Sequence, residues 1–236
     1  MPIRILRNIC LGAADLTYPI HCVVCRRSWH SVVCAQCLDK ITHIVPPVCA
    51  RCGLPTDRHI CGTCRTRKFH FEKARSSAVF EGALREAIHA LKYRNLKAVA
   101  DPLIEVMNKA YPFYNYRNSI DMIIPIPVHW SRIVERGFNQ SELLARGIAR
   151  HLSIRLETAM LYKAFKTPHQ ADLPFEQRLT NVAGSFAVRN AHKLQGKRAL
   201  LIDDVMTTGA TLDEAARALL EAGASSVVAY TLSRSL

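Results

Sequence analysis

Short apolar runs alternate with helix-forming segments along this chain from about residue 76 onward. Short, continuous apolar runs that are bounded by polar residues are typical of buried strands. The expected strands cover residues 76–82, 121–128 and 199–202, and the expected helices cover residues 83–91, 97–111, 141–151 and 212–221. This alternation predicts an α/β fold with a parallel sheet of roughly four to five strands, flanked by helices.

The pattern is different in the first part of the chain. Large apolar residues are scarce there, and four C-x-x-C motifs fall within residues 1–64. We therefore expect a small metal-binding module over residues 1–70 and the α/β domain over residues 71–236. Because so short a segment cannot fold around an apolar core alone, bound metal has to supply folding energy.

The N-terminal residues do not resemble a membrane anchor. Ile3, Leu6, Ile9 and Ala13 recur at helical spacing, which predicts a short amphipathic helix packed on the rest of the module. No apolar run in the sequence approaches the roughly 18 to 20 residues that a membrane span needs. We expect a cytoplasmic protein without membrane insertion.

Eight of the nine cysteines form the four C-x-x-C pairs. Four thiolates in two such pairs are a typical tetrahedral ligand set for structural Zn²⁺, so the count predicts two Cys₄ sites. The short connections favour consecutive pairing of the motifs, although the sequence leaves an interleaved arrangement open. The expected ligands are Cys22, Cys25, Cys34 and Cys37 for one ion and Cys49, Cys52, Cys61 and Cys64 for the other. A redox role is disfavoured, because a thioredoxin-like site needs a βαβ context that this segment lacks.

Residues 202–211 join the last predicted strand to the last predicted helix. Gly209 permits a phosphate to approach the backbone closely, and a helix N-terminus offers unpaired N–H groups and the positive end of the helix dipole. Asp203 and Asp204 can accept hydrogen bonds from vicinal hydroxyls or hold a hard cation. The segment predicts a site for a ribose and its 5′-phosphate, and an ordinary turn with an aspartate helix cap is the alternative. The expected site residues are Asp203, Asp204, Val205, Met206, Thr207, Thr208, Gly209, Ala210 and Thr211.

A second polar segment, residues 129–140, follows the predicted strand 121–128. Open α/β sheets bind ligands at the carboxyl ends of their strands, where this segment places His129, Arg132 and Arg136. The two guanidinium groups can bind a pyrophosphate through bidentate hydrogen bonds. A solvated basic loop is the alternative.

The chain is strongly basic, with 32 Lys and Arg residues against 19 Asp and Glu residues and a net charge of +13. Such an excess favours a polyanionic partner, most often nucleic acid. No helix with base-reading residues is visible, which disfavours a zinc-ribbon regulator of transcription.

Residues 202–211 resemble the binding signature of type I phosphoribosyltransferases, in which two acids and two spacers precede Thr-Thr-Gly-x-Thr. The resemblance implies that Asp203 and Asp204 contact the ribose hydroxyls of phosphoribosyl pyrophosphate (PRPP), that residues 207–211 wrap its 5′-phosphate, and that Mg²⁺ accompanies the pyrophosphate. It also implies that residues 166–181 close over PRPP as a lid. In a catalytic domain, Arg132, Arg136 and the lid residue Arg178 would stabilise the leaving pyrophosphate.

Over nearly its entire length the chain is similar to the ComF family, in which a double zinc ribbon precedes a phosphoribosyltransferase-like domain. The segments that carry this resemblance are residues 90–94, 124–140, 169–186 and 200–211. The resemblance implies a role in DNA uptake during natural transformation or in the use of DNA as a nutrient, with single-stranded DNA or a DNA-translocating ATPase as partner. The alternative is an active phosphoribosyltransferase that transfers ribose 5-phosphate from PRPP to an acceptor that the sequence does not identify.

Overall fold

The computed structural model describes residues 20–113, 119–165 and 182–236. The expected N-terminal helix and the expected lid, including Arg178, lie outside these residues. None of the described helices is long and apolar enough to cross a bilayer.

Contacts divide the chain into two compact units. The smaller unit comprises Met1–Ile41 with Glu81–Val99, and the larger unit comprises Thr42–Phe80 with Ala100–Leu236. The cysteine-rich segment is shared between them, since Cys22, Cys25, Cys34 and Cys37 belong to the smaller unit and Cys49, Cys52, Cys61 and Cys64 to the larger one. The sequence predicted a boundary between two domains near residue 70. The two compact units do not test that boundary, so it stays a prediction.

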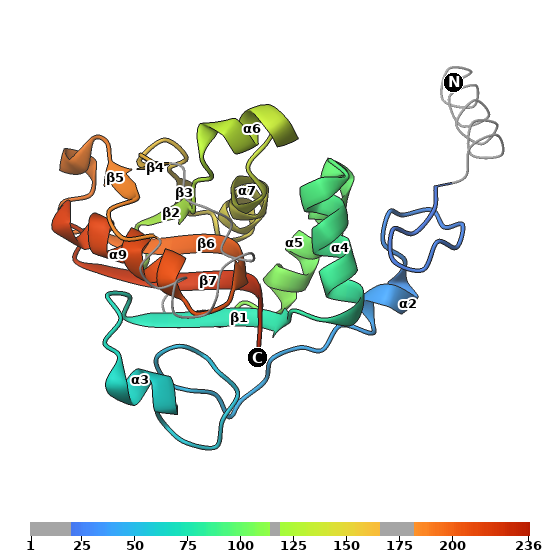
Figure 1. Ribbon diagram of the computed structural model, residues 1–236, viewed down its shortest axis with the longest axis horizontal. Helices are drawn as coiled ribbons and strands as arrows, with labels where there is room; N and C mark the ends of the chain where they lie inside the picture. The colour runs from blue at the N-terminus through green and yellow to red at the C-terminus, as the bar shows by residue number, and fades with distance from the viewer. Residues whose placement is uncertain (1–19, 114–118, 166–181) are drawn as a thin grey trace. The chain divides into compact units, whose positions relative to one another are not determined.

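A five-stranded sheet in which all neighbours are parallel forms the centre of the larger unit (Figure 1). In spatial order its strands are β1 (Lys73–Val79), β7 (Ser226–Arg234), β6 (Arg198–Met206), β2 (Met122–Pro125) and β3 (Arg155–Leu156). The β6–β7 ladder runs from Arg198 opposite Ser226 to Met206 opposite Arg234. The predicted α/β class and parallel sheet are confirmed.

Helices lie on both faces of this sheet. α5 (Ala100–Lys109) and α7 (Gln140–Leu152) lie on one face and α9 (Ala210–Glu221) lies on the other. The larger unit also contains α3 (Gly62–Thr66), α6 (Trp130–Arg136) and a 3₁₀ turn η4 (Ala191–Lys193). Leu201 of β6 packs in one apolar cluster with Leu212 and Leu219 of α9. On the other face, where α5 and α7 pack together, the Tyr230 hydroxyl of β7 donates to the Met107 carbonyl of α5 at 2.7 Å. On β7, Ala229 belongs to the apolar cluster on the α9 side while the next residue, Tyr230, faces α5, as the period of two requires.

A two-stranded antiparallel ribbon accompanies the sheet. It pairs β4 (Leu161–Lys163) with β5 (Phe186–Val188), and β5 contacts α9. The sequence patterns did not predict this ribbon, because strands of three residues are too short to show a period.

The smaller unit contains α2 (Ala35–Leu38), α4 (Gly82–Tyr93) and the 3₁₀ turn η1 (Lys97–Val99). α2 packs against α4. The helix expected over residues 97–111 is in fact η1 followed by α5, which begins at Ala100 so that Pro102 falls in the first turn, where no N–H is needed.

Candidate functional site

The two aspartates of the 202–211 segment lie inside β6, at its carboxyl end, and both are buried. β2 pairs with β6 only as far as Pro125 opposite Ile202, so Asp203 is the first β6 residue beyond the end of that neighbour. Its Oδ1 accepts hydrogen bonds from the Ser141 hydroxyl at 2.7 Å and from the Asp204 N–H at 2.9 Å. The two carboxylates therefore lie at the carboxyl edge of the sheet, beyond the point where β2 stops pairing with β6.

The turn after β6 is fixed by Gly209, the N-cap residue of α9. Its φ of +79° lies in the left-handed region, and a Cβ built there would come within 2.8 Å of the Met206 methyl carbon Cε. The Thr208 hydroxyl accepts a hydrogen bond from the N–H of Ala210 at 3.3 Å. The hydroxyl of the residue before the N-cap thus bonds the first N–H of α9, and the N-cap itself is a glycine rather than an aspartate.

Residues 129–140, for which the sequence left a solvated basic loop as the alternative, contain helix α6 and the first residue of α7. His129 caps α6 by accepting from the Ser131 N–H at 3.3 Å, and Gly137, with φ of +77°, ends that helix. Arg132 remains partly exposed and lies 3.4 Å from Glu135. Arg136 is buried, and it donates to the Gln140 side chain at 2.6 Å. Arg136 is therefore not a solvated cation.

Lys163 of β4 joins this site, although the sequence analysis did not single it out. The residue is half-buried, and its ammonium group lies 5.8 Å from the centre of the Phe186 ring. Burial lowers the pKa of Lys163, the Asp203 carboxylate raises it, and the Arg132 guanidinium lowers it further. These influences require Lys163 to lie within electrostatic range of both side chains. The structure thereby brings together two cations and a carboxylate from three separate segments.

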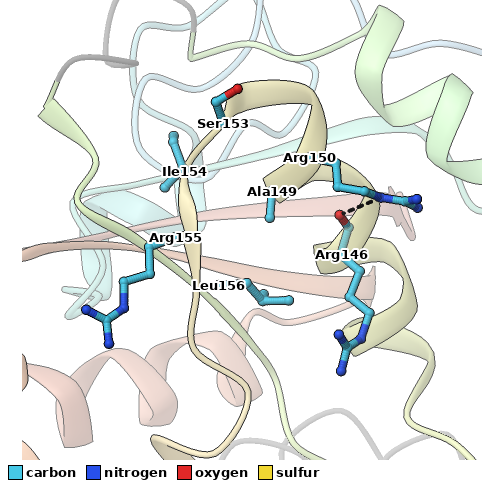
Figure 2. A pocket seen from close by; sticks show the side chains of 7 residues that line it. All are labelled: Arg146, Ala149, Arg150, Ser153, Ile154, Arg155 and Leu156. Carbon is cyan, nitrogen blue, oxygen red and sulfur yellow. Dashed lines mark hydrogen bonds between the residues drawn. The ribbon is translucent and has the colours of Figure 1, made fainter.

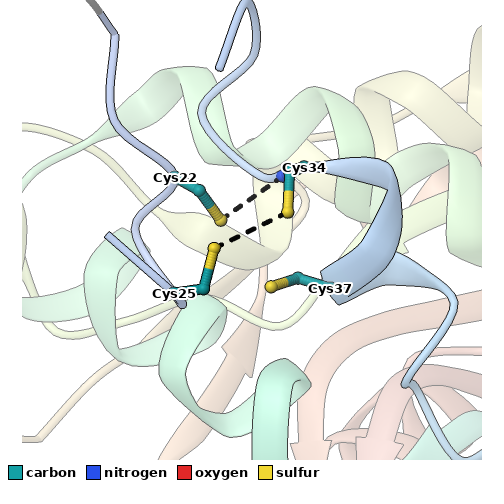
Figure 3. A group of neighbouring side chains, drawn as sticks. All are labelled: Cys22, Cys25, Cys34 and Cys37. Carbon is teal, nitrogen blue, oxygen red and sulfur yellow. Dashed lines mark hydrogen bonds between the residues drawn. The ribbon is translucent and has the colours of Figure 1, made fainter. Parts of the chain in front are cut away.

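Eight cysteines form two Cys₄ groups with the consecutive grouping, Cys22, Cys25, Cys34 and Cys37 in one and Cys49, Cys52, Cys61 and Cys64 in the other. In the first group the four side chains point toward one another (Figure 3). The sulfur atoms of Cys25 and Cys34 are 3.8 Å apart, and those of Cys52 and Cys61 are 3.6 Å apart. Four sulfurs about 2.3 Å from one tetrahedral zinc are separated by about 3.8 Å, so both groups fit Zn²⁺.

The two groups repeat the same local structure. In each, the N–H of the third cysteine donates to the sulfur of the first at 3.4 Å. Burial raises the pKa of the first thiol, but hydrogen bonds from several backbone N–H groups outweigh it and lower the pKa of Cys22 and of Cys49 to about 6. Hydrogen bonds, mainly from the backbone, thus favour one thiolate in each group, and the thiolate is the form that binds metal.

The second Cys₄ group is built into the core beneath the 202–211 segment. Cys49, Cys52 and Cys61 share an apolar cluster with Phe69, which lies 3.4 Å from the position of a Cβ at Gly209, and with Met206. Arg234, at the end of β7, donates to the Cys52 carbonyl at 2.7 Å. The second ribbon and the phosphate-loop candidate therefore share one core.

An ion-pair cluster at the start of α9 reinforces this connection. Asp213, in the first turn of α9, accepts from Arg67 at 2.9 Å, from the His70 N–H at 2.6 Å and from the His70 ring at 2.9 Å. Arg67 and His70 come directly after the second ribbon. The sequence showed Asp213 only as part of a helix, since its partners lie more than 140 residues away.

Comparison with known proteins identifies both parts of the chain. Residues 133–235 match the phosphoribosyl transferase domain model, and residues 13–69 match the double zinc ribbon domain model. Together with the sheet and the Cys₄ groups, these matches define a phosphoribosyltransferase-type α/β protein with an N-terminal double zinc ribbon.

Relatives of similar length narrow the assignment. The chain is 30% identical over 229 residues to the DNA utilization protein YhgH of Escherichia coli, covering 94% of this chain and 100% of that protein. It is 34% identical over 218 residues to the competence protein ComFC of Bacillus subtilis, covering 86% of this chain and 84% of that protein. The chain belongs to the ComF family of competence and DNA utilization proteins. Among solved structures, the glutamine PRPP amidotransferase of B. subtilis aligns with a TM-score of 0.37 and 22% identity over 56% of this chain and 26% of that one.

Proposed function

We propose that this protein binds PRPP at the 202–211 segment and acts in DNA uptake or DNA utilisation. The observation that carries the proposal is the geometry at the end of β6, where two buried aspartates precede a left-handed glycine turn at a helix N-terminus. Ribose offers vicinal hydroxyls to carboxylates, and a phosphate fits the N–H groups of such a turn. PRPP carries both groups on one sugar.

Each part of the site has a role in this proposal. Asp203 and Asp204 bind the ribose hydroxyls, and residues 207–211 bind the 5′-phosphate. Lys163 lies within electrostatic range of both Asp203 and Arg132, and the two cations are suited to bind the pyrophosphate. Bound Mg²⁺ would neutralise part of the pyrophosphate charge. Arg136 positions Gln140 at the start of α7, next to the Ser141 that holds Asp203.

The role in DNA handling is supported by the family and by the charge. Relatives are named for competence and for DNA utilization, and the net charge of +13 favours a polyanion. We propose single-stranded DNA as a ligand and a DNA-translocating ATPase as a candidate partner. Eight cysteines arranged for zinc need a reducing compartment, which supports a cytoplasmic location.

The alternative function is transfer of ribose 5-phosphate from PRPP to an acceptor. The proximity of Lys163, Arg132 and Asp203 favours it, since two cations can stabilise the charge that develops on a leaving pyrophosphate. A transferase needs a second site that binds the acceptor, whereas a protein that only binds PRPP does not.

Titration of the zinc-loaded protein with PRPP and Mg²⁺ tests the proposal. We expect saturable binding that falls about ten- to a hundredfold in each of Asp203→Asn and Asp204→Asn, because each substitution neutralises one carboxylate and a hydrogen bond to a charged group contributes about 1.5–3 kcal/mol. Unchanged affinity in both variants would show that the site lies elsewhere. Release of pyrophosphate that depends on an added acceptor would favour the transferase alternative.

A further inference from the structure

A cleft of about 640 Å³ lies between the C-terminal half of α7 and the edge strand β3 (Figure 2). We refer to it as the α7–β3 cleft. It is lined by Arg146, Ala149, Arg150, Ser153, Ile154, Arg155 and Leu156. Since β3 is the last strand in the sheet order, no further strand of the described sheet covers its outer side.

The lining of the cleft is cationic, with three arginines and no acidic residue. Arg146 is 2.5 Å from Glu142, one turn earlier on α7, and Arg155 pairs with Glu157. Within the described part of the chain, the Arg150 guanidinium has no carboxylate partner, and its Nε donates only to the Arg146 carbonyl at 3.4 Å. The cleft therefore carries a net positive charge even after its ion pairs are counted.

The three guanidinium groups do not converge on one point. Figure 2 shows Arg146 and Arg155 extending on either side of Leu156, while Arg150 extends in another direction from the end of α7. A single small phosphate cannot contact all three groups at once. A chain of phosphates can, and the apolar surface of Ala149, Ile154 and Leu156 between them suits the bases or sugars of such a chain.

We propose that the α7–β3 cleft binds single-stranded DNA, with Arg146, Arg150 and Arg155 contacting successive phosphates. The proposal rests on the DNA-binding part of the proposed function, and it locates the strand away from the PRPP site. Arginine suits this role because its planar guanidinium binds phosphate with two hydrogen bonds and also stacks on bases.

Helix α7 carries residues of both the proposed PRPP site and the α7–β3 cleft, but at different ends. Ser141, at the start of α7, holds Asp203, whereas Arg150 lies nine residues later, roughly 13 Å along the helix axis at about 1.5 Å per residue. A variant at Arg150 should therefore leave the PRPP site intact. This separation lets the two proposals fail independently.

The test measures binding of a fluorescent oligodeoxythymidylate to the zinc-loaded protein at several salt concentrations. We expect Arg150→Ala to weaken binding by about three- to tenfold at low salt, and Arg150→Glu to weaken it further. Replacing all three arginines with Ala should reduce the slope of log K against log salt by about 2, since each phosphate contact on a single strand contributes about 0.7. The matched control is Arg85→Ala, which removes one exposed arginine from α4 and should leave both quantities close to wild type.

PRPP affinity is measured on the same variants, and all of them should retain it. Equal DNA affinity and salt slope in the wild type and the triple variant would overturn the cleft assignment while leaving the PRPP proposal standing. Absence of any oligonucleotide binding by the wild type would overturn both the cleft assignment and the DNA ligand. If thymidine monophosphate or inorganic phosphate displaced the oligonucleotide at comparable concentration, the cleft would be a single-phosphate site and the assignment of a strand would be wrong. Should the triple variant misfold, Arg150→Ala decides alone, because Arg150 makes no ion pair in the described structure.

Discussion

Gly209 is held in a backbone conformation that a residue with a Cβ rarely adopts. The space that a Cβ would need is occupied by Met206, with Phe69 next to it. Two independent constraints, the positive φ and the close neighbours, therefore act on one residue. Both arise because the chain turns sharply from β6 into α9 while one side of the turn packs on the core.

We expect Gly209→Ala to destabilise the protein by about 1–2 kcal/mol and to reduce PRPP affinity at least about tenfold, since the turn must shift to admit the methyl group. Thermal unfolding and PRPP titration measure the two effects. Gly62→Ala is the control, because a Cβ there would meet no atom within 4 Å. Equal behaviour of the two variants would contradict the constraint at residue 209.

Helix α9 is the element that couples the phosphate-loop candidate to the zinc ribbon. Its first turn carries Asp213, which receives three hydrogen bonds from Arg67 and His70. The opposite end of α9 carries a different kind of ion pair, in which Glu221 lies 2.5 Å from Arg217 and is largely exposed. The same helix therefore offers a nearly buried ion pair and a solvated one.

Asp213→Asn should cost about 1–3 kcal/mol of unfolding free energy, because it leaves partly buried donors with a weaker acceptor. Glu221→Gln should cost less than about 1 kcal/mol, since water and salt screen an exposed pair. Denaturant unfolding of both variants tests the difference. A loss that is as large for Glu221→Gln as for Asp213→Asn would show that the Asp213 cluster has no special role.

At the scale of the whole molecule, the two zinc sites belong to different compact units although they repeat the same local structure. The second site shares its apolar cluster with Phe69 and Met206, next to the turn at Gly209. Loss of metal from the second site should therefore disturb the proposed PRPP site through the core, because structural zinc supplies folding energy to the segment that holds it.

Cys64→Ser and Cys37→Ser are matched variants that each remove the fourth ligand of one site. Both should lose about one equivalent of zinc, but only Cys64→Ser should also weaken PRPP binding, by at least about tenfold. Zinc content and PRPP titration give the two readouts. A PRPP affinity that falls equally in both variants, or in Cys37→Ser alone, would contradict the coupling through the second ribbon.

Several features could be derived from the sequence because they depend on neighbours along the chain. The apolar runs predicted β2 and most of the helices, the C-x-x-C spacing predicted two Cys₄ groups, and the Asp-Asp to Thr-Gly-x-Thr order located a strand-to-helix turn. Spacing favoured consecutive pairing of the cysteines but left it open, and the structure has that grouping. The PRPP contacts of these residues stay predictions.

Other features depend on residues that are far apart in sequence, and only the tertiary structure decided them. Lys163 on a three-residue strand, Ser141 beside Asp203, and the partners of Asp213 become neighbours only when the strands take the order β1-β7-β6-β2-β3. The arginines of the α7–β3 cleft likewise come from a helix end and an edge strand. A local sequence pattern shows which side of its own segment is apolar and will be buried. The order of the strands in the sheet brings distant segments together, and it is set by packing over the whole chain.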